Sequence, residues 1–200
     1  MSPLVVLSAV HDGIRMLAPR WDYFWWIRPK RVAYPGRMPN RSGLIHVNPC
    51  RYYLVGGPDY DMSIDGSNGL VAAIGENGVK VMCGTDMGPV RVLLRALTGV
   101  AKTEPDWDTV AEVDIVASEN WIRVMSSELE MRPDLGNLAC SGPGRYRVRV
   151  HARGRDDASR RGFVEEPVEE HLLEAWPVDS ATPAALMTDL DDVGVRFAAS

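Results

Sequence analysis

Residues 145–151 read Arg-Tyr-Arg-Val-Arg-Val-His and decide the fold class. Tyr146, Val148 and Val150 alternate with basic side chains, and alternate positions of a β-strand point to opposite faces of a sheet. Residues 141–144, Ser-Gly-Pro-Gly, come directly before and are typical of a tight turn. The stretch therefore predicts a strand with one apolar face toward a core and one face of arginines and a histidine.

Further short apolar runs, separated by Gly, Pro, Asp and Asn, predict more strands. They cover residues 51–55, 69–74, 79–83, 89–97, 111–115, 122–124 and 169–177. Residues 75–78, Gly-Glu-Asn-Gly, predict a hairpin turn in which Asn77 and Gly78 tolerate positive φ. Residues 117–120 predict a second hairpin, between 111–115 and 122–124. A helix stays open as the alternative for residues 89–97, because short apolar runs are ambiguous.

About eight strands at this spacing predict a mainly β fold, an antiparallel β-sandwich of two packed sheets. We expect this domain to cover residues 50–178. Residues 1–49 predict an irregular basic extension, rich in proline, which disfavours long helices. Residues 179–200 predict an acidic tail that is loosely attached or forms one marginal helix.

The composition, 46% hydrophobic and 24% charged, is that of a folded globular chain. No apolar run reaches the roughly 18 residues of a membrane span. A signal peptide has basic residues before its apolar run and a cleavage site after it. The apolar run of residues 3–10 has neither. We therefore expect a cytoplasmic protein. The chain has an odd number of cysteines, Cys50, Cys83 and Cys140, and no Cys-x-x-Cys pair, so we expect reduced thiols.

Charge is spread unevenly along the chain, and this indicates the kind of partner. The formal net charge is −5; residues 1–50 carry seven basic and two acidic side chains, a net +5, so the remainder carries −10. An acidic body repels the phosphates of nucleic acids. The sequence therefore favours a basic protein partner over direct binding to DNA or RNA.

No motif predicts a metal or a cofactor. The four histidines are isolated, and no glycine-rich phosphate-binding motif occurs. Asp59, Asp61 and Asp65 resemble a calcium loop, but their spacing departs from that motif and no bidentate Glu follows. We expect a solvated turn there, with an ion site as the alternative.

No sequence motif identifies catalytic residues either. Cys140 or Ser141 could pair with His151 or His171, but no nucleophile-elbow motif is present. We therefore expect a protein that is not an enzyme. A hydrolase with an unrecognised site remains an alternative, and it would require a deep pocket that gathers one of these histidines with carboxylates.

A glutamate-rich segment follows the arginine-rich strand, and it is the first candidate binding site. Its members are Glu165, Glu166, Glu169 and Glu170, with Glu174 further on. Two interpretations stay open: charge pairing with the arginines across strands on a solvated sheet face, or a polyanion-like surface that covers the basic groove of a nuclease.

The second candidate is the aromatic cluster that contains Trp21, Trp25 and Trp26. Trp is enriched at the centres of protein interfaces, whereas an exposed aromatic patch favours aggregation. The cluster is therefore either a flap packed on the domain or an anchor for a partner. The anchor would suit a structural or assembly protein, our alternative to a binding module.

From residue 50 to residue 178 the strand order resembles the competence protein J family, bacterial inhibitors of a DNA-entry nuclease, and uncharacterised bacterial proteins of the same layout. The resemblance rests on Tyr52-Tyr-Leu, the hairpin of residues 69–81, and the segments that begin at Val90, Trp107, Trp121, Gly142 and Glu170. It implies a β-sandwich without a cofactor that inhibits a nuclease by protein contact. The family offers no catalytic residue to carry over.

Overall fold

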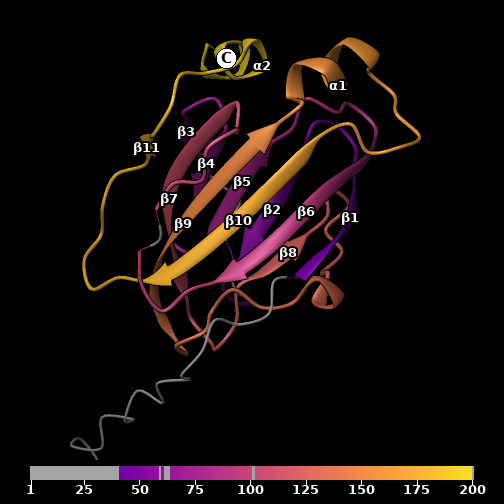
Figure 1. Cartoon of the computed structure of the whole chain (residues 1–200). Coiled ribbons are helices and arrows are strands. Elements are labelled where there is room, and N and C mark those ends of the chain that lie inside the picture. Colours follow the sequence, from indigo (N-terminus) through magenta and orange to yellow (C-terminus); the bar gives the residue numbers. More distant parts are fainter. Residues whose placement is uncertain (1–40, 59, 61–63, 101, 200) are drawn as a thin grey trace, which may run out of the picture. The chain divides into compact units, whose positions relative to one another are not determined.

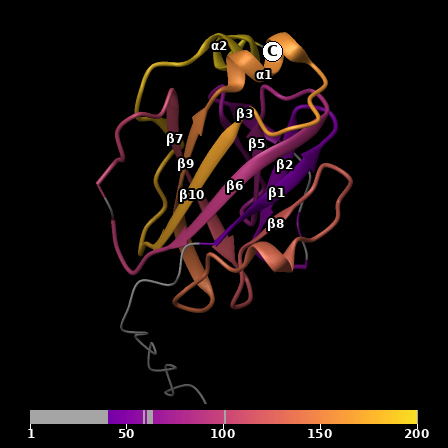
Figure 2. The same cartoon turned by 45° about the vertical axis from the view of Figure 1, so that its right-hand side comes forward.

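The computed structural model describes residues 41–58, 60, 64–100 and 102–199, without the side chains of residues 64–66. All of them belong to the unit that covers residues 31–200. Two β-sheets face each other in this unit, so the predicted mainly β sandwich is confirmed (Figure 1). Figure 2 shows the larger sheet in front, with β1, β6, β10, β9 and β7 side by side.

The larger sheet has six strands in the order β1-β6-β10-β9-β7-β11. Their bounds are β1 Arg41–Val47, β6 Gly88–Ala96, β10 Glu170–Pro177, β9 Gly144–Arg153, β7 Thr109–Ala117 and β11 Ala185–Leu186. The β6–β10 pair is parallel and the other pairs are antiparallel. The sandwich is therefore antiparallel except at this one pair, and it has more than the eight strands expected, because several short ones join its edges.

The smaller sheet has five strands in the order β3-β4-β5-β2-β8, all antiparallel. They are β2 Arg51–Val55, β3 Ile64–Ser67, β4 Val71–Ile74, β5 Gly78–Met82 and β8 Arg123–Met125. The β4–β5 hairpin is confirmed, with Ile74 opposite Gly78. Its positive φ falls on Gly75, at 54°, and not on Asn77 or Gly78.

The second predicted hairpin is wrong. β7 lies in the larger sheet beside β9, whereas β8 lies in the smaller sheet beside β2. Residues 118–122 therefore cross from one layer to the other. The local pattern of alternating residues identifies strands, but it does not say which sheet each one joins.

The core lies between the layers and contains the apolar side chains that the period of two predicts. Tyr146, Val148 and Val150 of β9 are at most 1% exposed. They belong to one apolar cluster with Leu54 and Val81 of the opposite sheet. The strand alternative for residues 89–97 is also confirmed, since β6 places Val90, Val92 and Leu94 in this core.

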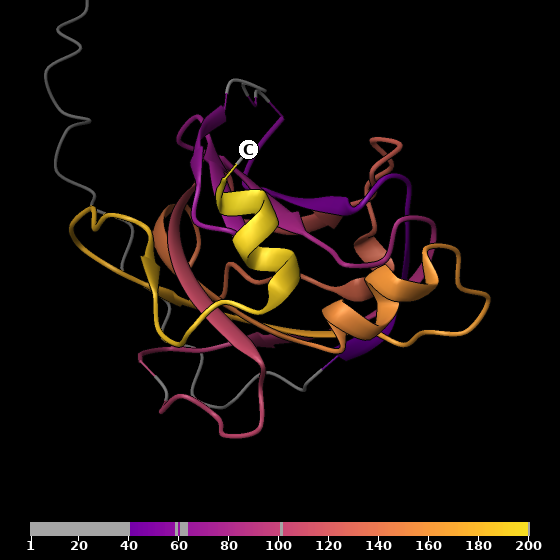
Figure 3. The same cartoon turned by 90° about the horizontal axis from the view of Figure 1, so that it is seen from above.

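Two segments outside the predicted sandwich boundaries are part of it. Strand β1, Arg41–Val47, falls in the range expected to be an extension and pairs with β6 over its whole length. β11 and α2, Asp192–Ala198, fall in the expected tail. Figure 3 shows α2 and α1, Arg155–Arg161, over the same end of the sandwich. Within the described part of the chain, no helix has the length and apolar character to cross a bilayer.

Candidate functional site

An exposed apolar pair stands at the end of the sandwich where β6 begins. Phe163 is 60% exposed and Met87 is 45% exposed, and the two residues form an isolated parallel bridge. The backbone fixes the pair: Met87 N donates to Gly162 O, and Val164 N donates to Met87 O at 3.0 Å. We call Phe163, Met87, Asp86, Glu165 and Glu166 the Phe163 patch.

The rim of the Phe163 patch is mainly acidic. Asp86, Glu165 and Glu166 are exposed, and within the described residues neither glutamate forms an ion pair. The nearest basic residues in the sequence are Arg161 and Arg160, both exposed, and Arg160 is paired with Asp157. An apolar centre with a charged rim is the usual anatomy of a protein interface.

The structure separates the four glutamates predicted to bind a partner. Glu165 and Glu166 are exposed as that role requires, and Glu170 is half-buried in an ion pair with Arg153 at 2.9 Å. Glu169 is 1% exposed and points inward. It therefore cannot contact a partner at the surface, because its carboxylate is enclosed by the chain.

Glu169 belongs to a buried polar cluster that the sequence did not reveal. His171 Nε2 lies 2.8 Å from Glu169 Oε1, and Tyr52 Oη lies 2.8 Å from His171 Nδ1. Thr85 donates to Glu169 Oε2 from its backbone N and its hydroxyl, both at 2.8 Å. Cys83 completes the cluster, with its sulfur within 4.8 Å of the ligand atoms of Glu169 and His171.

Proton positions in the cluster follow from its contacts. Burial by itself would raise the pKa of Glu169, but the hydrogen bonds from His171 and Thr85 outweigh it and hold that pKa below its usual range. An ionised carboxylate can only accept, so His171 carries a proton on Nε2. Burial raises the pKa of Tyr52 well above its usual value, so its phenol stays protonated.

A histidine, a carboxylate and a thiol thus converge, and a histidine beside a carboxylate is part of what the hydrolase alternative requires. Their burial argues against it: Tyr52, Cys83 and His171 are 0% exposed. Burial, followed by the charge of Glu169, raises the pKa of the Cys83 thiol well above its usual value. A protonated, enclosed thiol is not a nucleophile. The hydrogen bonds of the cluster instead connect β2 to β10.

Cys83, Glu169 and His171 could in principle hold a metal ion, since thiolate, carboxylate and imidazole all bind zinc. The hydrogen bonds described above already occupy Glu169 and both nitrogens of His171. An ion would have to displace the His171–Glu169 contact. The arrangement is complete as a hydrogen-bonded network of protein groups.

The arginine face of β9 pairs across strands with the predicted Glu170 and Glu174 and also with Glu112 of β7, and its centre is not solvated. Arg147 and Arg149 are at most 5% exposed, and both bind Glu112 of β7. The segment after β10 covers Arg147, whose guanidinium donates to the carbonyl oxygens of Thr182 and Pro183 at 3.0 Å. The prediction of a solvated face is wrong at Arg147 because this segment folds back over the sheet there.

The imagined nucleophile–base pairs do not form within the described residues. Cys140 Sγ donates to the carbonyl of Leu97 and lies 3.6 Å from Ser141 Oγ. His151 lies against Trp107, with the ring centres 5.5 Å apart. Trp21, Trp25, Trp26, Asp59 and Asp61 lie outside the described residues, so the aromatic anchor and the ion site stay predictions.

Only part of these sites left a signal in the sequence. Glu169 and His171 are two positions apart at a strand, which places both side chains on one face. Tyr52 of β2 and Cys83, directly after β5, are far apart in the sequence, so no local pattern joins them. Phe163 and Val164 are two apolar residues in a polar stretch, and only the fold brings Met87 beside Phe163.

Two solved structures are similar to this chain. "Crocagin biosynthetic gene J" matches with a TM-score of 0.43 and 16% identity, covering 71% of this chain and 100% of its own. ComJ from Bacillus subtilis, described as an inhibitor of the DNA degrading activity of NucA, matches with a TM-score of 0.47 and 13% identity, covering 72% and 98%. The resemblance to the competence protein J family is thus confirmed as a structural similarity. No protein-family model and no curated protein matches the sequence.

Proposed function

We propose that this protein is a non-enzymatic binding module that holds a basic protein through the Phe163 patch. The observation that carries the proposal is the exposure of Phe163 beside Met87, fixed by backbone hydrogen bonds and bordered by three carboxylates. Aromatic side chains supply much of the affinity at interfaces. A rigid backbone lowers the entropy cost of association.

The charge of the patch favours a basic partner. Asp86, Glu165 and Glu166 are three exposed carboxylates, and the basic residue nearest to Phe163 in the sequence is Arg161. Opposite charge steers association and selects partners. A nuclease is the partner class that this chemistry supports best, because a DNA-binding groove presents a row of basic side chains. The resemblance found in the sequence suggests the same class.

The buried cluster supports a role without catalysis. Its ionisable groups are closed to solvent, and the thiol nearest to the histidine is held protonated. These side chains stabilise the end of the sandwich that presents the patch, since Glu169 binds Gly84 and Thr85 directly before Asp86 and Met87.

A pull-down from a lysate of the source organism, with and without matched substitutions, tests the proposal. Phe163→Asp and the double variant Glu165→Lys, Glu166→Lys should each weaken capture of the partner at least tenfold. The double variant should lose most at low ionic strength, where surface charges are least screened. A captured nuclease should lose activity on DNA when the wild-type chain is added.

The controls carry the same changes at the other end of the sheets. Val100→Asp matches the aromatic substitution at a side chain that is 73% exposed. Glu76→Lys with Glu119→Lys matches the charge reversal at two exposed glutamates. Both controls should retain full capture. Equal recovery of the same proteins by all variants would refute the patch as the binding surface.

A further inference from the structure

A pocket of about 260 Å³ lies at the end of β6 opposite the Phe163 patch. Strand β6 runs from Gly88 at the patch to Ala96 at the pocket, a distance of roughly 26 Å at the usual rise per residue. The lining comes from both layers: β1 and β6 on one side, and β8 with the turn η1, Pro133–Leu135, on the other. The two surfaces are therefore separate.

The floor of the pocket is apolar. Leu94, Ala96, Pro133 and Leu135 line it, and Leu135 is 2% exposed in the core. Leu135 also lies close to Gly43 of β1, where an added Cβ would come within 2.4 Å of its Cδ2. An apolar group could rest on this floor without displacing a polar contact.

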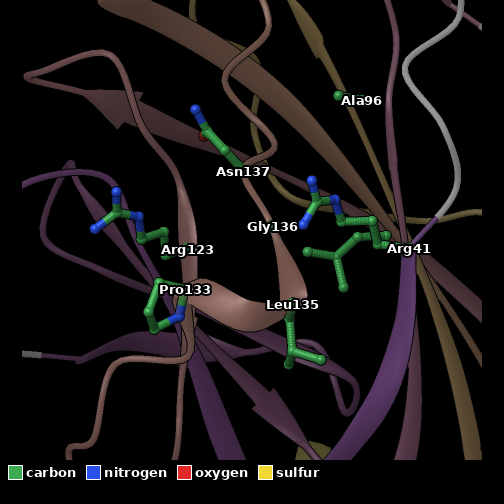
Figure 4. A pocket seen from close by; sticks show the side chains of 8 residues that line it. Arg41, Ala96, Arg123, Pro133, Leu135, Gly136 and Asn137 are labelled. Atoms are coloured by element: carbon green, nitrogen blue, oxygen red, sulfur yellow. The ribbon is translucent and has the colours of Figure 1, made fainter.

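The charged groups of the lining are two arginines, Arg41 and Arg123, and there is no carboxylate among the lining residues. Neither arginine forms an ion pair within the part of the chain that the structure describes. In Figure 4 they stand on either side of Asn137. Two positive charges without a counterion among the described residues are unusual in a chain whose net charge is −5.

Each arginine lies against a neighbouring residue. Arg123 lies over the ring of Trp121, 5.0 Å from its centre. Arg41 lies across Gly136, where a Cβ would come within 2.8 Å of its Cδ. The amide of Asn137 is occupied by the backbone of Asn120, Ile122 and Ala139. Recognition of a polar ligand therefore falls to the two guanidinium groups.

We propose that this pocket binds a small organic carboxylate, with its acid group at Arg41 and Arg123 and its apolar part on Leu94, Ala96 and Leu135. Guanidinium groups match carboxylates in shape and charge. The volume is small beside the roughly 300–1,000 Å³ usual for ligand sites, which suits an acid the size of hexanoate or benzoate. The segment before Arg41 is a poor occupant, because residues 31–40 carry two arginines and no acid.

The test is a titration of the full chain with sodium hexanoate, followed by amide chemical shifts in NMR spectra. Saturable shifts should centre on Gly136 and Asn137. Arg41→Gln and Arg123→Gln should each weaken binding about tenfold or more, the usual effect of losing a hydrogen bond between charged groups. Arg91→Gln, an exposed arginine of β6 outside the pocket, should leave binding unchanged.

Three comparison ligands at equal ionic strength make the result decisive. Hexanol and hexylamine should bind at least tenfold more weakly than hexanoate, because they lack the negative charge. Inorganic phosphate should also bind more weakly, because it lacks the apolar part. Absence of saturable shifts with millimolar hexanoate, unchanged affinity in both arginine variants, or equal affinity for any comparison ligand would overturn the proposal. Well-dispersed spectra of the variants establish that they are folded.

Discussion

His151 lies on the outer face of β9, in a row of apolar side chains. The strand registers place it between Val110 of β7 and Leu172 of β10, with Leu93 beyond. Its ring is 0% exposed, and neither ring nitrogen has a hydrogen-bond partner at normal distance. The period of two predicted its face correctly. It did not predict burial, because the cover, which includes Trp107, comes from elsewhere in the chain.

Burial lowers the pKa of His151 to about 4, with Arg149 adding to the effect, while a long contact with the Leu172 backbone and the charge of Glu104 oppose it. The ordinary value in an unfolded chain is about 6.5. Between these two values the unfolded chain binds more protons than the folded one, so acid favours unfolding. His151 therefore reduces stability as the pH falls from about 6.5 toward 4, and it has no such effect at neutral pH.

We predict that His151→Leu changes the free energy of unfolding at pH 7 by less than about 1 kcal/mol. The new side chain is similar in volume and removes two unpaired polar atoms. Between pH 6.5 and 5 the variant should lose less stability than the wild type. Urea unfolding at pH 7, 6 and 5 measures both effects. Parallel pH profiles for the two proteins would show that His151 does not titrate as described.

At the scale of elements, four strands share one row of alternating charge on the outer face of the larger sheet. Glu112 of β7, Arg149 of β9, Glu174 of β10 and Arg95 of β6 follow one another across the registers. Arg95 binds Glu174 at 2.8 Å, and Arg149 binds Glu112 at 2.8 Å. Glu174 is 0% exposed, so its charge depends on these neighbours.

We predict that Glu174→Gln lowers the free energy of unfolding by about 3 kcal/mol, because it leaves the guanidinium groups of the half-buried Arg95 and the buried Arg149 short of counter-charge. The control is Glu170→Gln on the same face of the same strand. Its partner Arg153 is 47% exposed, so this change should cost less than about 1 kcal/mol. Urea midpoints measure both, and equal losses would contradict a buried charge row.

Most strands could be predicted from the sequence, whereas their pairing and the apolar part of the candidate surface could not. β5, β6 and β9 follow the alternation of apolar residues, and β2 and β10 follow short apolar runs; both are local properties of the chain. The parallel β6–β10 pair and the separation of β7 from β8 depend on long-range pairing. Of the candidate surface, Glu165 and Glu166 were found from charge alone, whereas Phe163 and Met87 required the fold.

At the scale of the whole molecule, residues 179–199 hold the two sheets and α1 together. β11 pairs with β7, and Thr182 N donates to Asp114 at 2.8 Å. Asp191 caps α2 by accepting from Gly194 N, and it also binds Arg155, a residue of α1 that is 0% exposed. Arg155 in turn donates to the carbonyls of Gly69 and Met82 in the smaller sheet. The segment thus contacts both layers.

We predict that a chain ending at residue 178 loses at least about 3 kcal/mol of unfolding free energy, because Arg155 is then buried without its counterion. A loosely attached tail, as the sequence suggested, would leave stability unchanged. Asp191→Asn in the full chain removes the counterion of Arg155 but keeps the segment that covers it. Helix α2 should stay capped, since Asn caps helices about as well as Asp. The substitution should reproduce much of the loss while keeping the segment. Urea unfolding compares the three proteins; a truncated chain as stable as the wild type would show that residues 179–200 contribute no stability to the sandwich.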